Sequence, residues 1–264
     1  MEGRVLLKKI KYTGNLKAIT GIRIGDSKES TEIGGVDGPV IRRRYDGQPY
    51  LPGSSIKGKM RCLLELVYGE NAESNASKCV YSGGEESLIC LLFGSSDNKE
   101  KINELDKKLE KATSSDSSKE KSKIEAEKRK FEGNQSRLIV RDAYLTEDSV
   151  KKLESSPFTD MPYTEVKVEN CINRITGKAE NPRSFERVPA GAEFKVEFII
   201  NIFKGDNEEA LIQMFKNGIE LLENDYLGGC GSRGYGQVKI HLNQPEEICA
   251  SKYIVTSNGE AGKS

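Results

Sequence analysis

The sequence contains a single histidine, His241, and no tryptophan. One histidine excludes a ribonuclease mechanism that uses two, and the position of His241 far along the chain from the other candidate residues disfavours a mechanism that uses one. No apolar run reaches the length of a membrane-spanning helix, and the N-terminus lacks the apolar stretch of a signal peptide. The six cysteines lack the spacing of a disulfide scaffold. We therefore expect a protein of the reducing cytoplasm.

Net charge is absent as well, because 41 basic residues balance 41 acidic ones. This balance disfavours a protein that binds nucleic acid over its whole surface. The charges are nevertheless segregated: residues 42–61 hold six cations and one anion, whereas residues 206–225 hold six anions and one cation. We expect one face to attract polyanions, and the other to repel them or to meet the basic face of a neighbouring copy.

The most informative stretch runs from Ile33 to Tyr68. Apolar residues recur in it at helical spacing, which predicts a helix that begins at the pair Ser54 and Ser55 and ends at Gly69. Its first turns carry three cations, which are Lys57, Lys59 and Arg61. Cations are unfavourable at the positive end of the helix dipole unless an anion occupies the site. The pattern therefore predicts a phosphate site at the helix N-terminus, and a solvated basic face is the alternative.

A glycine-rich loop runs from Gly228 to Gly236 and contains a formal G-x-G-x-x-G pattern. In a dinucleotide-binding domain this pattern follows a strand and opens a helix, whereas here it follows a predicted helix and opens a predicted strand. A dinucleotide site is therefore excluded. Arg233 and Tyr235 favour close approach to a nucleic-acid backbone, with the tyrosine available for base stacking. A long surface connection is the alternative.

Asp37 lies in the sequence Val-Asp-Gly-Pro, before the predicted helix. An aspartate before glycine most often forms a turn. The functional alternative is a carboxylate that holds a divalent metal or positions a ribose 2′-hydroxyl for attack on its own phosphate. Glu165 and Glu169 are further candidate carboxylates, although an alternating strand would place them on a solvated face. Cys79 and Cys90 have no CxxC partner and are expected to be loop or core residues rather than zinc ligands.

The predicted order of elements is strand, helix, strand, strand, helix, strand, which is the ferredoxin-like α+β order. Charged residues 97–132 interrupt it and are expected to form a helical hairpin or a partly disordered excursion. Residues 172–187 are expected to project as a hairpin. The remaining elements are strands at 4–24, 137–145, 163–170, 192–203 and 237–242 and a second helix at 208–223.

Four segments together resemble the backbone-subunit family of the type III-A CRISPR effector, the Csm complex, within the RAMP superfamily. They read IGGVDGPVI, LPGSSIKGKMR, YTEVKVENCINRITGKAENPRSFER and DYLGGCGSRGYGQV. The resemblance covers most of the chain in order. It departs at Arg23, where members of the family often carry a histidine, and in the length of the charged insertion.

The resemblance implies one RAMP domain over 1–264 with a ferredoxin-like, RRM-like palm at 1–70, 136–168 and 188–243. It further implies a helical charged insertion at 71–135, a thumb at 169–187 and a C-terminal tail at 244–264. Several copies would stack along a guide RNA beside other Csm subunits: the large polymerase-like subunit, the small subunit and the subunits that cap the guide ends. No membrane and no organic cofactor are implied.

The resemblance also implies a reaction. Each subunit would cut a complementary target RNA once, using Asp37 as the catalytic residue and as a ligand of a divalent cation, Mg²⁺ or Mn²⁺. This transesterification would leave a 2′,3′-cyclic phosphate and a 5′-hydroxyl. The implied RNA-binding residues are Ser54, Ser55, Lys57, Lys59, Arg61, Arg174, Arg183, Arg187, Arg233 and Tyr235. The alternatives are a non-catalytic filament subunit, a free-standing guide-processing nuclease, and a backbone subunit of another type III subtype.

Overall fold

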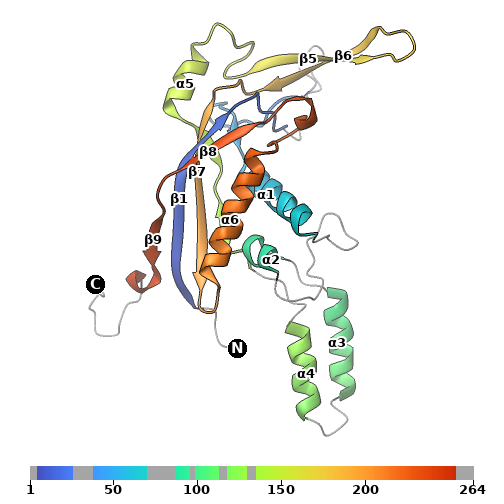
Figure 1. The fold of residues 1–264 in the computed structure, drawn as a ribbon, viewed down its shortest axis with the longest axis vertical. Helices are drawn as coiled ribbons and strands as arrows, with labels where there is room; N and C mark the ends of the chain where they lie inside the picture. The colour runs from blue at the N-terminus through green and yellow to red at the C-terminus, as the bar shows by residue number, and fades with distance from the viewer. Residues whose placement is uncertain are drawn as a thin grey trace.

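A computed structural model describes residues 5–25, 38–69, 87–95, 99–112, 118–129 and 135–253. Its main feature is an antiparallel sheet in the order β2-β4-β7-β1-β8, in which β3 also pairs with β7 and β9 with β1 (Figure 1). These strands are β1 (Leu6–Ala18), β2 (Tyr50–Leu51), β3 (Leu138–Val140), β4 (Ala143–Leu145), β7 (Glu193–Phe203), β8 (Val238–Leu242) and β9 (Glu246–Cys249). The helices are α1 (Gly53–Tyr68), α2 (Leu88–Phe93), α3 (Lys99–Ala112), α4 (Ser118–Arg129), α5 (Glu147–Glu154) and α6 (Glu208–Glu223), with short 3-10 turns η1 (Gly231–Arg233) and η2 (Ala250–Tyr253).

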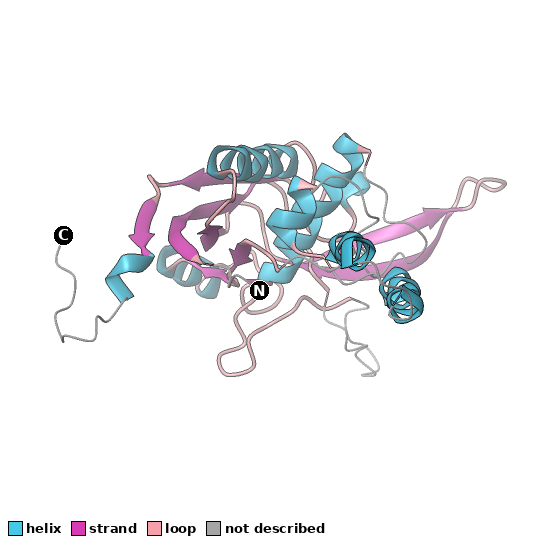
Figure 2. Ribbon diagram, turned by 90° about the horizontal axis from the view of Figure 1, so that it is seen from below, coloured by secondary structure: helices cyan, strands magenta, loops and turns pink. Residues whose placement is uncertain are grey.

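The core lies between the sheet and the layer formed by α1, α2 and α6 (Figures 1 and 2). Along β7, alternate residues are buried because successive side chains of a strand point to opposite faces. The helix layer packs onto this apolar face through Phe215 of α6, whose ring centre lies 5.1 Å from that of Tyr12 and 5.2 Å from that of Phe198. On the opposite face of the sheet, Asn15 and Lys195 are exposed.

The predictions of the long helices and the central strands are confirmed. These elements were predictable because the apolar periodicity of their sequences is long and regular. The predicted strand at 137–145 is instead two short strands, β3 and β4, separated at Arg141 and Asp142. Helix α5 was missed, although Thr146 caps it by accepting a hydrogen bond from the Ser149 N–H, and two acidic residues follow in the first turn.

Two segments that were expected to lie outside the palm belong to the main sheet and its core. Helix α2, within the expected insertion, has buried Ile89 and Leu92 in the main core. Strand β9, within the expected tail, pairs with β1 through Lys8 to Lys11. The charged part of the insertion does form helices α3 and α4, which an ion pair of 2.5 Å between Lys128 and Asp106 joins.

A hairpin of β5 (Glu165–Ile172) and β6 (Ala179–Arg187) projects from one end of the main sheet (Figure 1). We call residues 165–187 the thumb. Among the described residues, β5 pairs only with β6. The expected strand at 163–170 is therefore present but belongs to the thumb, which begins at residue 165 rather than 169. Within the described part of the chain, no helix is both long and apolar enough to cross a bilayer.

Replacing Phe215 by alanine should lower the free energy of unfolding by about 3–5 kcal/mol, because the ring fills the contact between α6 and the two central strands. Urea denaturation measures this change. The matched control is Phe158→Ala: that ring is 87% exposed, so its loss should change the free energy by less than about 0.5 kcal/mol. Similar small effects of both substitutions would contradict this packing.

Candidate nucleic-acid interface

Segments that the sequence singled out separately come together at the base of the thumb. The chain after β1 pairs with the residue that follows the thumb, through Ile22 and Val188, and Gly38 forms a parallel bridge with Phe185 in the thumb. The guanidinium of Arg23 lies 4.6 Å from the Phe185 ring centre. This end of the sheet therefore joins the chain after β1, the segment that follows Asp37, and the thumb.

The glycine loop reaches the same place. The Gly229 N–H donates to the Arg23 carbonyl at 2.8 Å, and the Gly236 N–H donates to the Gly21 carbonyl at 3.0 Å. At Gly228, where φ is +88°, an added Cβ would lie 2.3 Å from the Arg23 carbonyl oxygen. Only glycine permits this close approach and this backbone conformation. The loop is therefore packed against the chain after β1, rather than being a plain surface connection.

Asp37, the expected catalytic residue and metal ligand, lies outside the described residues, as does Cys79. The first described residue after Asp37 is Gly38, whose carbonyl accepts a hydrogen bond of 3.2 Å from the Glu186 N–H in the thumb. The predicted role of Asp37 stays a prediction. The residue directly attached to it is nevertheless held against the thumb base.

The start of α1 differs from the expected phosphate site. The helix begins at Gly53 with Pro52 as its N-cap, so Ser54 and Ser55 lie inside the first turn. The Gly53 N–H donates to the Asp142 carboxylate at 2.8 Å, and the N–H groups of Ser55 and Ile56 donate to the Pro52 carbonyl. Among the described residues, only the Ser54 N–H of this turn has no partner. An internal carboxylate therefore accepts from one of the N–H groups that were expected to bind an anion.

The three cations of this helix are also paired within the chain. Lys57 donates to the Ser136 hydroxyl at 2.6 Å and to the Leu138 carbonyl at 2.8 Å. Burial, and then repulsion from Arg61, lowers the pKa of Lys57. These contacts direct Lys57 toward β3.

Lys59 and Arg61 have partners of a different kind. Lys59 forms an ion pair of 2.9 Å with Asp225 and lies 3.7 Å from the Tyr226 ring centre. Arg61 pairs with Glu65 at 2.6 Å and donates to the Gly94 carbonyl at 2.6 Å. The acidic and basic segments of the sequence thus meet within one chain at Asp225.

Tyr235 is not open to a base. Its side chain is buried, with Lys167 and Arg187 of the thumb 4.4 and 5.0 Å from the ring centre. Burial, followed by the nearby Glu169 carboxylate, raises the pKa of Tyr235 to about 12. The expected stacking on a nucleic-acid base is therefore not supported. The ring instead joins the glycine loop to the thumb by cation–π contacts.

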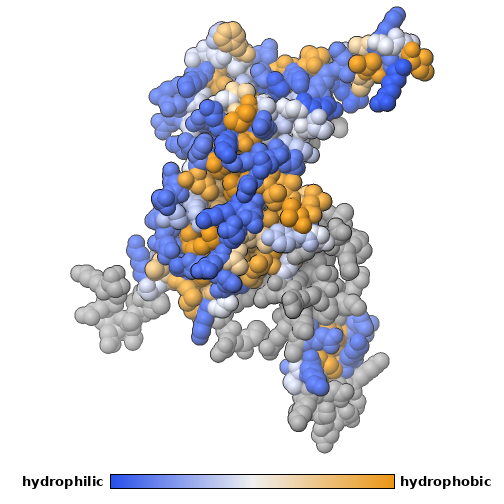
Figure 3. Space-filling model, in the orientation of Figure 1, coloured by the Kyte–Doolittle hydropathy of each residue, from blue (hydrophilic) through white to orange (hydrophobic). Residues whose placement is uncertain are grey.

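The remaining candidate cations divide into paired and unpaired groups. Arg187 forms an ion pair of 2.6 Å with Glu165, and Arg233 one of 3.2 Å with Glu169. These two carboxylates therefore neutralise cations rather than forming a solvated face. Arg174, in the thumb tip, and Arg183, on β6, are exposed and have no partner in the part of the chain that the structure describes. Figure 3 shows apolar atoms beside hydrophilic ones at the thumb tip, where Ile175 is exposed.

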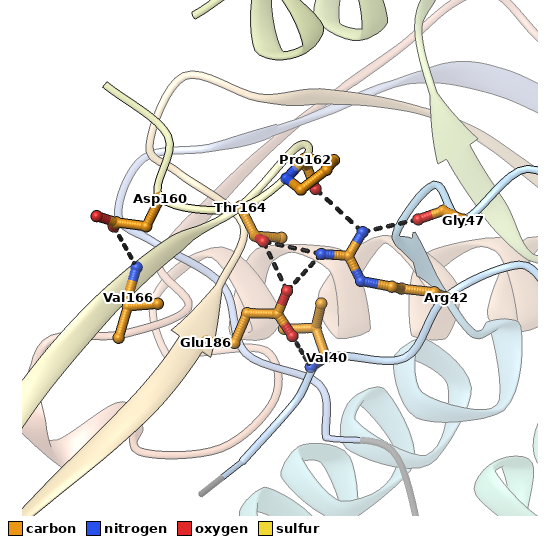
Figure 4. Close-up of polar contacts among 8 residues, drawn as sticks. All are labelled: Val40, Arg42, Gly47, Asp160, Pro162, Thr164, Val166 and Glu186. Atoms are coloured by element: carbon orange, nitrogen blue, oxygen red, sulfur yellow. Dashed lines mark hydrogen bonds and ion pairs between the residues drawn. The ribbon is translucent and has the colours of Figure 1, made fainter. Parts of the chain in front are cut away.

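Glu186, which the sequence did not single out, lies at the centre of the thumb base (Figure 4). Its side chain is buried and accepts hydrogen bonds from the Val40 N–H, the Thr164 hydroxyl and the Arg42 guanidinium. One signal was available: Glu186 precedes the apolar Val188 by two residues, so strand alternation places it on the buried face. The first arginine of the triplet thus contacts the thumb.

The described carboxylates at this end do not fit a metal site. Glu165, Glu169 and Glu186 each pair with an arginine. In the described ranges, no group of three or more histidine, cysteine or acidic side chains is placed to hold a metal ion.

A family model of the RAMP superfamily matches residues 15–239. The chain is also 37% identical over 265 residues to the "CRISPR system Cms endoribonuclease Csm3" of Methanocaldococcus jannaschii, with 100% of this chain and 90% of that protein covered. The chain belongs to the RAMP superfamily, in its Csm3 family. A second Csm3, from Methanothermobacter thermautotrophicus, is 38% identical, with 97% of this chain and 92% of that protein covered. The crystal structure of Methanopyrus kandleri Csm3 shares the fold, with a TM-score of 0.61, 24% identity, and 94% of this chain and 79% of that one covered.

Replacing Tyr235 by phenylalanine should remove part of the alkaline loss of stability of this Csm3-family chain. The pKa of the Tyr235 phenol lies above its unfolded-state value of about 10 when the chain is folded. The phenol therefore stabilises the fold fully below about pH 10 and loses that contribution as the pH rises toward 12. The free energy of unfolding of both proteins, measured between about pH 8 and pH 11, should diverge at high pH. Parallel curves would show that the phenol is not responsible.

Replacing both Arg174 and Arg183 by alanine should weaken RNA binding most at low salt, because both are exposed and unpaired in the described structure. The slope of log affinity against log salt for single-stranded RNA should fall by about 0.7 for each phosphate that the protein no longer neutralises. Fluorescence anisotropy at several salt concentrations measures the slope. The control is Lys216→Ala, an exposed cation on α6. An equal effect of the control would mean that the thumb has no special role.

Proposed function

We propose that this chain is a backbone subunit of a type III-A CRISPR interference complex that binds guide RNA and cleaves complementary target RNA at regular intervals. The observation that carries the proposal is its similarity, along its whole length, to a relative named as a CRISPR endoribonuclease. The convergence of the segment after Asp37, the glycine loop and the thumb at one end of the sheet supports it.

The proposal includes a ferredoxin-like palm. Strands β4, β7, β1 and β8 are neighbours in that order, and α1 and α6 pack on the same face of the sheet. In chain order this is the strand–helix–strand–strand–helix–strand arrangement, with β5 and β6 inserted as the thumb. The exposed cations of the thumb would then contact RNA.

In the proposed reaction the ribose 2′-oxygen attacks the adjacent phosphorus and the bond from phosphorus to the 5′-oxygen breaks. The 2′-hydroxyl loses its proton, and the departing 5′-oxygen gains one. Asp37 would position the 2′-hydroxyl or accept its proton. A divalent cation, Mg²⁺ or Mn²⁺, is part of the proposal because Mg²⁺ commonly binds one or two carboxylates together with substrate phosphates.

The proposed partners are the guide RNA, the target RNA, further copies of this chain and the other subunits of the complex. The relatives' names place those proteins in a CRISPR system. We propose that this assembly works in the cytoplasm, where its RNA substrates would be met.

Replacing Asp37 by alanine should abolish target cleavage while leaving target binding unchanged. The complex assembled on guide RNA is mixed with complementary target and Mg²⁺, and the products are resolved on a denaturing gel. Wild type should give evenly spaced cuts, whereas the variant should cut at least about 100-fold more slowly, within the range of rate losses seen when a general acid or base is removed. EDTA should stop the wild-type reaction.

The matched control is Asp46→Ala, because Asp46 is an exposed aspartate after the arginine triplet that pairs with Arg43. It should cut like wild type. Cleavage by Asp37→Ala at the wild-type rate would show that Asp37 is a turn residue. Absence of cleavage by the wild-type complex would leave a non-catalytic RNA-binding subunit.

A further inference from the structure

We propose that Glu186 is a positioning residue for cleavage: its carboxylate ties the base of the thumb to the segment that follows Asp37, so that the seating of the thumb determines where that segment lies. This inference rests on the proposed function. It assigns a role to a side chain that is buried inside the protein.

Both oxygens of the Glu186 carboxylate accept hydrogen bonds. One oxygen, Oε2, accepts from the Val40 N–H at 2.8 Å, and the other, Oε1, accepts from the Thr164 hydroxyl at 2.6 Å and from Arg42 Nη2 (Figure 4). Glu186 is 1% exposed and Thr164 is 0% exposed. A buried carboxylate with three donors strongly disfavours any displacement that would remove one of them.

Arg42 extends these contacts to both sides. Its Nη1 donates to the Gly47 carbonyl at 2.7 Å and to the Pro162 carbonyl at 3.0 Å, and its Nη2 donates to the Thr164 hydroxyl at 2.9 Å. Pro162 and Thr164 belong to the chain that enters the thumb. The guanidinium therefore joins the turn after the arginine triplet to the thumb entrance. We call Arg42, Thr164 and Glu186 the clamp.

The main chain of Glu186 continues the clamp toward Asp37. Its N–H donates to the Gly38 carbonyl at 3.2 Å, while its side chain accepts from the Val40 N–H. On the other side, a Cβ added to Gly38 would lie 2.2 Å from Arg23 Nη2. Gly38, which one peptide bond joins to Asp37, is thus enclosed between Glu186 and Arg23.

A second buried ion pair provides a comparison. Arg137 and Asp206 form a bidentate pair at 2.9 and 3.0 Å, with side chains only 6% and 7% exposed. This pair joins the residue before β3 to the turn after β7, at the opposite end of β7 from the thumb (Figure 1). Both pairs stabilise the fold, but only the clamp joins the thumb to the segment after Asp37. The two pairs therefore separate a loss of stability from a loss of positioning.

The test compares four variants with wild type and with Asp37→Ala in guide-loaded complexes. Glu186→Gln replaces one carboxylate oxygen by an NH2 group, which then faces one of the donors that the carboxylate accepted from. Thr164→Val removes the hydroxyl at nearly constant side-chain volume, and Thr164→Ser keeps a hydroxyl at this position. Asp206→Asn is the control for loss of a buried ion pair. Single-turnover cleavage, target affinity and thermal unfolding are measured for each complex.

We expect Glu186→Gln and Thr164→Val to cut at least about 10-fold more slowly, since misplacing a reacting group by about 1 Å costs up to about 100-fold in rate. Target affinity should stay within about twofold, because the substituted side chains of Glu186 and Thr164 are buried in the protein. Thr164→Ser should cut within about twofold of wild type. Asp206→Asn should unfold at a lower temperature but cut at the wild-type rate.

Wild-type cleavage rates in Glu186→Gln and Thr164→Val, with Asp37→Ala inactive, would overturn the inference and leave the proposed function intact. An Asp206→Asn complex that cuts as slowly as the clamp variants would also overturn the inference. If the Glu186→Gln chain does not assemble into a guide-loaded complex, the cleavage rates of Thr164→Val and Thr164→Ser test the inference: equal rates would overturn it. Cleavage by Asp37→Ala at the wild-type rate would instead overturn the proposed function.

Discussion

The buried carboxylate of Glu186 is the constraint on which the thumb base, at one end of the main sheet, depends. A charge removed from water is tolerated only when hydrogen bonds and an opposite charge compensate it, and here the donors come from Val40, Arg42 and Thr164. The first two of these donors lie more than 140 positions before Glu186 in the chain. The thumb pairs with no strand of the described main sheet, yet its base is fixed. The carboxylate thereby fixes the base of the hairpin to the segment around Val40 and Arg42.

Charge compensation extends through the rest of this end of the molecule. The basic start of α1 and the acidic end of α6 meet in the pair of Lys59 with Asp225, and Glu165 and Glu169 neutralise arginines of the thumb and the glycine loop. A net charge of zero is therefore consistent with a nucleic-acid interface. Several cations here hold protein segments in place, whereas Arg174 and Arg183 are exposed on the thumb. Such an interface would bind RNA through a few well-placed contacts.

Glycine and aromatic residues supply the close contacts that charge alone could not. The backbone of the glycine loop approaches the chain after β1 so closely that a side chain at Gly228 would collide with the Arg23 carbonyl. Tyr235 then places its ring under two thumb cations. A loop whose glycines suggest flexibility in the sequence is thus packed between the chain after β1 and the thumb. Its glycines permit close backbone contact.

The sequence by itself determined the long elements. Apolar periodicity located α1, α6 and β7, and local composition located the projecting hairpin and the charged helices, because each signal lies within a few residues of the chain. Only the tertiary structure decided that Asp142 accepts from the first N–H of α1, that Lys57 faces β3 and that Glu186 is buried among three donors. Most of those pairings join residues that lie far apart along the chain, so no local pattern specifies them. The local sequence does not distinguish a cation that would bind RNA from one that holds two loops together, because the fold alone determines which partners lie beside each.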